Sequence, residues 1–286
     1  MYTEHLNKLL AVVGPTAVGK SDYAVQLAKK VNGEIISADS RQVYKGLDIG
    51  TGKITKKEMR GVPHHLLDVV SPKNTYTVSD YKRDAEKVIE DVLSRGKTPI
   101  ICGGTGFYIQ TVVDNIDLPE VPPNEALRKK LEGYSLEKLQ ATLKDLDPER
   151  FKTVDQNNPR RIIRAIEIAT AIGRVPPVKK SSRYEVEMIG LTAPTEVLQK
   201  RIHSRLLKRA EMGMIKEVEN LHLKGLSWKR MGELGLEYRY IARYLQGKLS
   251  KEEMITQLEK EIVRYAKRQM TWFKKDKRIK WLTIKN

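Results

Sequence analysis

Short apolar runs alternate with helix-periodic stretches over the first third of the chain. Residues 8–13 (KLLAVV) form an apolar run, and residues 21–31 then place apolar side chains at helical spacing. Two further apolar runs, 34–37 and 98–102, enclose a helical pattern over 78–94. Because parallel strands need crossover helices between them, this alternation predicts an α/β fold with a parallel sheet flanked by helices.

A helix-rich segment interrupts the sheet pattern. It extends over residues 115–185, begins with three prolines between 119 and 123, and ends with a proline pair at 176–177. Strand-like sequence returns at 186–191. We therefore expect residues 115–185 to form a helical insertion domain.

The remaining segments, 1–114 and 186–286, are expected to form one α/β core. Beyond residue 195 the pattern predicts two or three helices, with helix formers throughout 250–272. A short strand is expected at 279–284.

The composition is that of an ordinary globular protein. Of 286 residues, 40% are hydrophobic and 31% are charged, which excludes wholesale disorder. The lone cysteine, Cys102, excludes an intramolecular disulfide and any site built from several thiolates. No apolar run approaches the roughly 18 residues of a membrane span, and the start MYTEHLNKLL lacks a secretory pattern. We expect a cytoplasmic monomer with no membrane partner.

Positive charge is concentrated in the C-terminal third. The formal net charge is +17; residues 195–286 carry 23 basic and 11 acidic side chains, whereas residues 1–114 carry 16 and 13. A polyanion partner would explain this concentration, and so would a solvated helix surface. Composition alone leaves both explanations open.

A glycine-rich turn follows the first predicted strand. The sequence GPTAVGKS matches GxxxxGK[ST] and stands between a predicted strand and a predicted helix, which is the context of a P-loop. Its backbone amides and lysine would bind adjacent phosphates, and its serine hydroxyl would bind Mg²⁺. The motif does not specify ATP, because any diphosphate meets the same requirements. The predicted diphosphate-binding residues are Gly14, Pro15, Thr16, Ala17, Val18, Gly19, Lys20 and Ser21.

Two further strand ends carry polar side chains. Asp39 follows the second predicted strand, where it would bind Mg²⁺, accept a proton from a nucleophile, or cap a turn. The third strand ends in Gly103-Gly-Thr105, where P-loop ATPases often have an aspartate. This substitution disfavours an ATPase, and the small residues allow a flat group to approach closely.

The histidines are weaker candidates. His64 and His65 are adjacent and point in different directions on most backbones, which favours a structural role over metal binding. His5, His203 and His222 are isolated, and surface or packing roles suffice for them.

One arginine pair and the cysteine complete the polar candidates. Arg201 and Arg205 are one helical turn apart, so both either face one anion or lie on a solvated face. Cys102 lies in the third predicted strand and is expected to be buried packing rather than a nucleophile.

Seven motifs follow one another in an order that is specific to one protein family. They are GPTAVGKS from Gly14, DSRQVY from Asp39, DIGTGK from Asp48, PHHLLD from Pro63, GGTGFY from Gly103, NPRRIIRAIE from Asn158 and RYAKRQMTWF from Arg264. Over nearly its whole length the chain resembles the tRNA dimethylallyltransferases, or isopentenyl-pyrophosphate:tRNA transferases, in their shorter bacterial form. It departs from them at Glu237, where the family usually has glycine.

The resemblance implies a prenyl transfer with Mg²⁺ as cofactor. A dimethylallyl group would pass from dimethylallyl diphosphate to the exocyclic N6 amine of the adenosine 3′ of the anticodon, position 37, and diphosphate would be released. The resemblance makes Asp39 the general base, gives Thr105 a hydrogen bond beside it, and assigns Arg205 to the charge of the leaving group.

The implied RNA partner is the tRNA anticodon stem-loop, in which the target adenosine must be flipped out of its stack. The resemblance places RNA contacts after the second strand, on the helical insertion and on the basic C-terminal helix. On that helix three cations recur at i, i+3 and i+4, which puts them on one face. The predicted tRNA-binding residues are Asp39, Ser40, Arg41, Gln42, Thr105, Arg128, Arg160, Arg161, Ile162, Ile163, Arg164, Arg264, Lys267 and Arg268.

Three rival functions are compatible with the glycine-rich turn. An adenylate isopentenyltransferase would prenylate a free adenine nucleotide and would not need the insertion or the basic C-terminal third. A small-molecule P-loop kinase would transfer phosphate from ATP and would need a second nucleotide pocket. A non-catalytic RNA-binding module would leave the turn and Asp39 without a chemical role.

Overall fold

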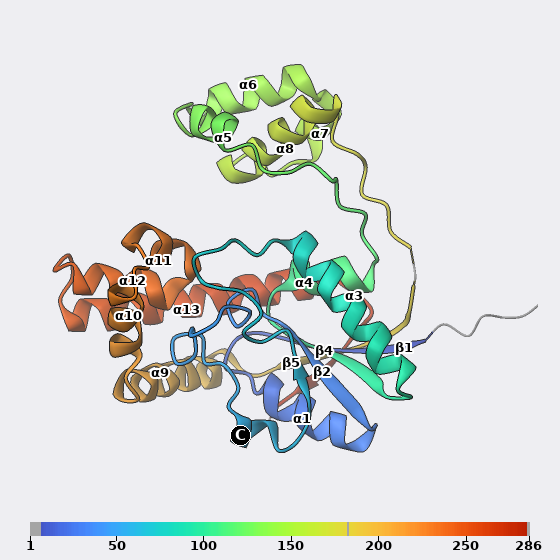
Figure 1. Ribbon diagram of the computed structural model, residues 1–286, viewed down its shortest axis with the longest axis vertical. Helices are drawn as coiled ribbons and strands as arrows, with labels where there is room; N and C mark the ends of the chain where they lie inside the picture. The colour runs from blue at the N-terminus through green and yellow to red at the C-terminus, as the bar shows by residue number, and fades with distance from the viewer. Residues whose placement is uncertain (1–6, 182, 285–286) are drawn as a thin grey trace, which may run out of the picture. The chain divides into compact units, whose positions relative to one another are not determined.

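The computed structural model describes residues 7–181 and 183–284; His5 lies outside them. Within this part of the chain, six strands form one parallel sheet in the order β3-β2-β4-β1-β5-β6. Figure 1 labels β1, β2, β4 and β5 of this sheet. The α/β class that the sequence predicts is confirmed. The strands are β1 (Lys8–Val13), β2 (Gly33–Ala38), β3 (His64–His65), β4 (Thr98–Gly103), β5 (Glu185–Thr192) and β6 (Ile279–Thr283).

The strands other than β3 lie where the apolar runs predict them, apart from one or two residues at their ends. The sequence does not predict β3, because two residues show no periodicity. This strand forms through tertiary pairing instead: His64 pairs with Ile35 and His65 pairs with Ile36, at the edge of the sheet.

Helices cover both faces of the sheet, because successive side chains of a strand point to opposite faces. Leu9, Ala11 and Val13 of β1 pack on the side of α3 and α4. Leu10 and Val12 pack on the side of α1. Figure 1 shows α1 on one side of the sheet and α3 and α4 on the other. The helices are α1 (Lys20–Lys30), α2 (Lys56–Met59), α3 (Val78–Ser94), α4 (Gly106–Val113), α5 (Glu125–Glu132), α6 (Leu136–Leu146), α7 (Pro148–Thr153), α8 (Pro159–Ile172), α9 (Thr195–Glu211), α10 (Met214–Leu223), α11 (Trp228–Leu234), α12 (Leu236–Leu245) and α13 (Lys251–Phe273).

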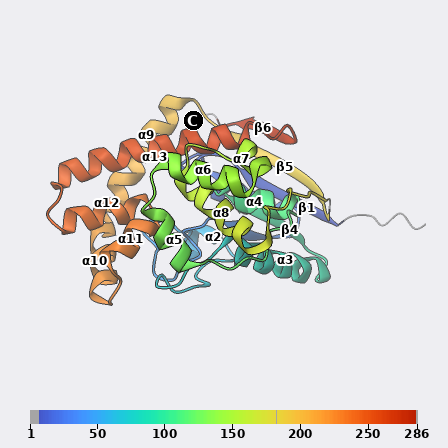
Figure 2. The same cartoon turned by 90° about the horizontal axis from the view of Figure 1, so that it is seen from above.

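Five helices, α9 to α13, follow β5 in the described residues, so the prediction of two or three is wrong. The turns at Gly213 and Gly235, both with positive φ, are too short to interrupt the apolar pattern. These helices enclose a second apolar core that includes Leu206, Met231 and Leu258. Figure 2 shows α13 passing beside α9 and α12, which both pack against it. Among the helices of the described residues, none has the length and apolar character that crossing a membrane requires.

Ile116–Ser181 forms one compact unit, and the rest of the described chain forms the other. Helices α5 to α8 enclose the apolar core of the smaller unit, in which Leu143 and Ile162 are fully buried. Glu167 of α8 is also buried and accepts hydrogen bonds from Arg128 and Arg164. The helical unit therefore has its own apolar core and its own ion pairs.

A buried carboxylate ties β2 to the neighbouring segments. Glu34 is 2% exposed and accepts hydrogen bonds from Arg95, Lys97 and His65. The hydrogen bonds from Arg95 are the main reason why the pKa of Glu34 lies well below its ordinary value; burial opposes them, and Lys97 and His65 add to them. The charged form of Glu34 is therefore part of the folded structure.

We expect Glu34→Gln to lower the free energy of unfolding at pH 7 and to make it less sensitive to acid. A carboxyl group whose pKa is depressed in the folded state contributes fully above its unfolded pKa of about 4.3, and the contribution is lost as pH falls towards the folded pKa. The difference between wild type and variant should therefore narrow from pH 5 to pH 3 in urea unfolding. Asp91→Asn, which removes the exposed partner of Arg95, is the control. A difference that stays constant with pH would contradict this role of Glu34.

Candidate active site

The glycine-rich turn joins β1 to α1 with the backbone geometry that its glycines allow. Gly14 and Gly19 have φ values of 143° and 101°. A Cβ at Gly14 would collide with the carbonyl oxygen of Leu191, so that position requires glycine. α1 begins at Lys20, and its N-cap Gly19 provides no side-chain cap for the first helical amides. These amides and the helix dipole form a site for an anion.

Lys20 is the cation of this turn. Its ammonium donates a hydrogen bond to the carbonyl oxygen of Pro15 at 2.7 Å. Desolvation lowers the pKa of Lys20 to about 8, although the nearby Asp39 opposes the shift. The shift indicates that the groups around the ammonium do not fully compensate its charge, so a bound anion would stabilise it.

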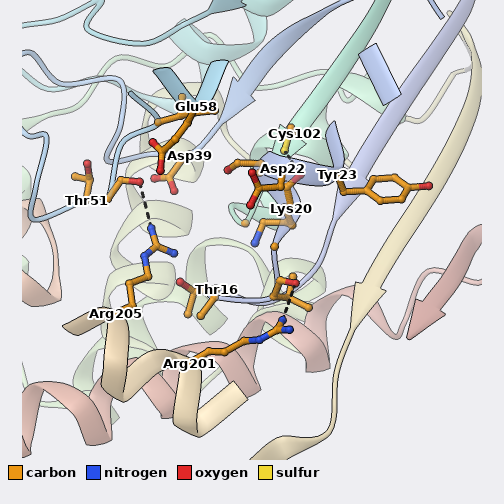
Figure 3. A pocket seen from close by; sticks show the side chains of 18 of the residues that line it. Thr16, Lys20, Asp22, Tyr23, Asp39, Thr51, Glu58, Cys102, Arg201 and Arg205 are labelled. Atoms are coloured by element: carbon orange, nitrogen blue, oxygen red, sulfur yellow. Dashed lines mark hydrogen bonds between the residues drawn. The ribbon is translucent and has the colours of Figure 1, made fainter. Parts of the chain in front are cut away.

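A cavity of about 920 Å³ lies beside the turn (Figure 3). Its lining includes the turn from Thr16 to Ser21, Asp39 after β2 and Gly103 at the end of β4. Side chains from α9 and α13 complete the lining. The cavity therefore stands at the carboxyl ends of parallel strands, where open α/β sheets usually bind their ligands.

Two arginines of α9 point towards this cavity, as Figure 3 shows. Arg205 donates a hydrogen bond to the carbonyl oxygen of Gly52 at 3.2 Å, and Arg201 donates one to that of Val18 at 3.3 Å. Desolvation lowers the pKa of Arg205, and the neighbouring Arg209 lowers it further. The sequence leaves open whether Arg201 and Arg205 share an anion or a solvated face, and this geometry favours the anion.

Asp39 lines the cavity at the end of β2. Its carboxylate accepts a hydrogen bond from the amide of Arg41 at 2.8 Å, which orients the side chain. Thr105, the N-cap of α4, accepts a hydrogen bond from the amide of Ser40 at 3.0 Å. Thr105 therefore supports the backbone next to Asp39.

Gln269 of α13 joins the turn to the end of β4. Its side-chain oxygen accepts a hydrogen bond from the amide of Thr16 at 2.8 Å, and its side-chain nitrogen donates one to the carbonyl oxygen of Gly104 at 2.9 Å. Sequence reasoning did not identify this residue. A signal was present, because Gln269 stands on the buried face of α13 together with Ala266 and Phe273, where an apolar side chain is expected.

A second network, also not predicted, anchors residues 48–52 (the anchor loop). The carboxylate of Glu217 accepts hydrogen bonds from the first three amides of this loop at 2.7–3.0 Å, and from the hydroxyl of Tyr238 at 2.8 Å. Arg209 donates to a carbonyl oxygen of the same loop at 2.8 Å and pairs with Glu237 at 3.3 Å. The departure from the family pattern at Glu237 thus supplies Arg209 with a counter-charge. Because Arg205 also bonds to this loop, the network helps to set the cavity wall.

The predicted RNA-binding residues fall into exposed and internal groups. Arg264, Lys267 and Arg268 are exposed on α13, and Arg160 and Arg161 are exposed at the start of α8.

The assignment of RNA contacts to two isoleucines of α8 requires correction. Ile162 and Ile163 are 0% and 8% exposed and pack in the core of the helical unit, so their side chains face the protein interior. Arg128 and Arg164 lie between these groups: both are half-buried and direct their guanidinium groups to Glu167.

The four histidines within the described residues have structural partners, as the sequence indicates. His64 bonds to the carbonyl oxygen of Val62 at 2.9 Å, and burial lowers its pKa. His203 pairs with Glu259, and His222 stacks on a tryptophan ring. Within the described chain, no group of three or more His, Cys, Asp or Glu residues could hold a metal ion. Burial raises the pKa of the Cys102 thiol to about 11, so the thiol stays protonated at neutral pH.

We expect Glu217→Gln to loosen the anchor loop. An amide side chain has only one acceptor oxygen and turns a donor group towards the loop amides. Hydrogen–deuterium exchange at residues 48–50 should rise roughly tenfold or more, as expected for the loss of hydrogen bonds to a charged acceptor. Glu219→Gln, on an exposed neighbour that pairs with Lys216, is the matched control. Unchanged exchange at residues 48–50 in Glu217→Gln would rule out the anchor.

Similarity to proteins of known activity extends over most of the chain. A family model described as IPP transferase matches residues 42–276. The tRNA dimethylallyltransferase 2 of Treponema denticola is 46% identical over 272 residues, which cover 93% of this chain and 91% of that protein. The tRNA dimethylallyltransferase of Anoxybacillus flavithermus is 42% identical over 283 residues, which cover 97% of this chain and 90% of that protein.

Solved structures show the same relationship. The crystal structure of the tRNA isopentenylpyrophosphate transferase from Bacillus halodurans matches with a TM-score of 0.75 and 40% identity, over 97% of this chain and 90% of that one. A eukaryotic dimethylallyltransferase acting on tRNA matches with a TM-score of 0.82 and 28% identity, over 97% of this chain and 74% of that one. The chain therefore belongs to the IPP transferase family.

Proposed function

We propose that this protein transfers a dimethylallyl group from dimethylallyl diphosphate to the N6 amine of adenosine 37 in a tRNA and releases diphosphate. One observation carries the proposal: Lys20, Arg205 and Asp39 line a single cavity, so two desolvated cations and a carboxylate converge on the same space. The chain belongs to the IPP transferase family, and its relatives include tRNA dimethylallyltransferases, so the protein is a prenyltransferase. This relationship supports dimethylallyl diphosphate and tRNA as the two substrates.

The cationic side of the cavity fits the diphosphate. The turn offers backbone amides and the amino end of α1, and Lys20 and Arg205 supply positive charge. The lowered pKa values of both side chains indicate that each cation is desolvated, and such cations interact strongly with a developing anion. The two cations thereby stabilise the diphosphate as it leaves.

The acidic side of the cavity fits the amine. The N6 nitrogen attacks the allylic carbon C1 while the bond from C1 to the diphosphate oxygen breaks. The electron pair of that bond leaves with the diphosphate, and Asp39 accepts the proton that the nitrogen gives up. The amide of Arg41 holds the carboxylate in place, and Thr105 supports the adjacent backbone.

The donor set fits a Mg²⁺ ion that arrives with the diphosphate. The described residues contain no group of three or more His, Cys, Asp or Glu side chains that could hold a metal ion, and Mg²⁺ commonly combines one or two protein oxygens with substrate phosphates. Ser21 is exposed at the start of α1 and lines the cavity, so we assign its hydroxyl to the metal. When bound, the ion would neutralise part of the phosphate charge.

RNA contacts are proposed for three exposed or half-exposed groups. Asp39, Ser40, Arg41 and Gln42 surround the place where the extruded base would enter. Arg160 and Arg161 belong to the helical unit, and the cations of α13 would follow phosphates of the stem-loop. This set is consistent with the high positive charge of the C-terminal third.

We expect Asp39→Asn to retain tRNA binding and to lose prenyl transfer by roughly 100-fold or more, as removal of a general base does. Mass analysis of RNA nucleosides after incubation with dimethylallyl diphosphate measures the transfer, and fluorescence anisotropy measures the binding. Undiminished turnover would favour a non-catalytic role for Asp39. Phosphate transfer from ATP, or prenylation of free adenine nucleotide instead of tRNA, would support one of the rival enzymes.

We also expect the affinity for dimethylallyl diphosphate, measured without tRNA, to fall as pH rises through 8. The pKa of Lys20 is about 8 in the ligand-free protein, and a bound anion favours its protonated form. Binding is therefore tightest below pH 8 and weakens by up to about tenfold per pH unit above it, until the pKa of the complex is reached. Calorimetry from pH 7 to pH 9.5 would measure this, and Lys20→Arg should show a flat profile. An equally steep profile in that variant would assign the effect to another group.

A further inference from the structure

Two large apolar side chains are exposed beside the candidate active site. Phe107 is 42% exposed and Trp272 is 37% exposed. The chain has only three phenylalanines and three tryptophans, and the other four are half-buried or buried. Among the phenylalanines and tryptophans, therefore, only this pair is exposed; one tyrosine near them on α13, Tyr265, is also exposed, at 36%.

Both rings lie three residues along the chain from groups that line the cavity: Phe107 follows Gly104, and Trp272 follows Gln269. Trp272 is in the last turn of α13 and Phe107 is in the first turn of α4, with ring centroids 6.4 Å apart and ring planes at 71°. A Cβ at Gly106 would collide with the indole of Trp272, so the indole rests on the backbone of α4. The preceding residue, Thr105, bonds to the residue after Asp39. The ring pair therefore stands on the same two helices, α4 and α13, that are joined to the cavity wall through Thr105 and Gln269.

Cations flank the rings. Arg268 lies one turn before Trp272 on α13, with its guanidinium 5.9 Å from the ring centroid of Tyr265. Lys274 and Lys275 follow the end of the helix, and all three cations are exposed. Exposed rings among cations are typical of sites for unpaired nucleotides, where bases stack on the rings and phosphates contact the cations. Such charge complementarity favours RNA over an apolar protein partner.

We propose that Phe107 and Trp272 form a stacking platform for the base next to the target adenosine. The inference rests on the proposed function, because moving an adenosine from the loop into the cavity leaves the neighbouring base without its stacking partner. A ring of the platform takes the place of that partner. The platform therefore stabilises the flipped-out RNA and leaves diphosphate binding unchanged.

The test uses the full protein and an anticodon stem-loop RNA. Phe107→Ala should lower kcat/KM for the RNA roughly tenfold, in line with the loss of one stacked base, while KM for dimethylallyl diphosphate stays constant. Phe107→Tyr should restore the rate, and Trp272→Phe should lose less than Trp272→Ala. Leu223→Ala, a truncation of a side chain that is 75% exposed on α10, is the matched control and should have no effect. Thermal unfolding verifies that each variant folds.

Stem-loops with an abasic nucleotide on either side of the adenosine identify the contacted base. On one of these two RNAs, kcat/KM of the wild type should be about tenfold lower than on the complete stem-loop. On that same RNA, kcat/KM of Phe107→Ala should equal that of the wild type. The platform is overturned if Phe107→Ala has the same kcat/KM as the wild type on the complete stem-loop. It is also overturned if, on both abasic RNAs, the loss caused by the substitution multiplies with the loss caused by the missing base. If the wild type modifies none of these RNAs, the proposed function itself fails, which separates the two outcomes.

Discussion

The site depends on a desolvated cation that the protein alone does not neutralise. Lys20 is held in a glycine-rich turn, where its nearest partner is a neutral carbonyl oxygen, and its pKa falls to about 8. A charge in this position costs free energy until an anion binds, which makes the turn selective for phosphate groups. Arg205 of α9 is a second desolvated cation in the same cavity, so in the proposed function two cations face one diphosphate.

Hydrogen bonds from other parts of the molecule fix the positions of the groups around these two cations. Gln269 connects the turn to β4 through two hydrogen bonds, so α13 is part of the active-site framework as well as the basic surface. Glu217 fixes the anchor loop, which in turn bonds to Arg205. Asp39 directly follows β2, the second strand from one edge of the sheet, and a backbone amide orients its carboxylate. The C-terminal helices therefore have two roles: they support the cavity wall and they expose cations to the solvent. The charge pattern of the sequence indicates only the second role.

Local patterns explain what the sequence could predict. The apolar runs located β1, β2, β4, β5 and β6, and the spacing of GPTAVGKS located the turn, because each signal lies within a few residues. Gln269 and Glu217 were not predicted, because their partners lie 253 and about 168 residues away and only the folded chain brings them together. Ile162 and Ile163 were misassigned for a different reason: the whole motif was assigned to RNA, although helical periodicity, which is a local signal, turns these two side chains into the core of the helical unit. The helices after β5 were undercounted because one- or two-residue glycine turns leave the periodicity intact.

A crystal structure with an unreactive thio analogue of dimethylallyl diphosphate tests the central claim most directly. Both phosphates should lie within hydrogen-bonding distance of the amides of residues 16–21 and of the Lys20 ammonium, with the allylic carbon directed towards Asp39. A turn that stays empty in the presence of the analogue but binds and consumes ATP would contradict the assignment of the cavity to a prenyl diphosphate.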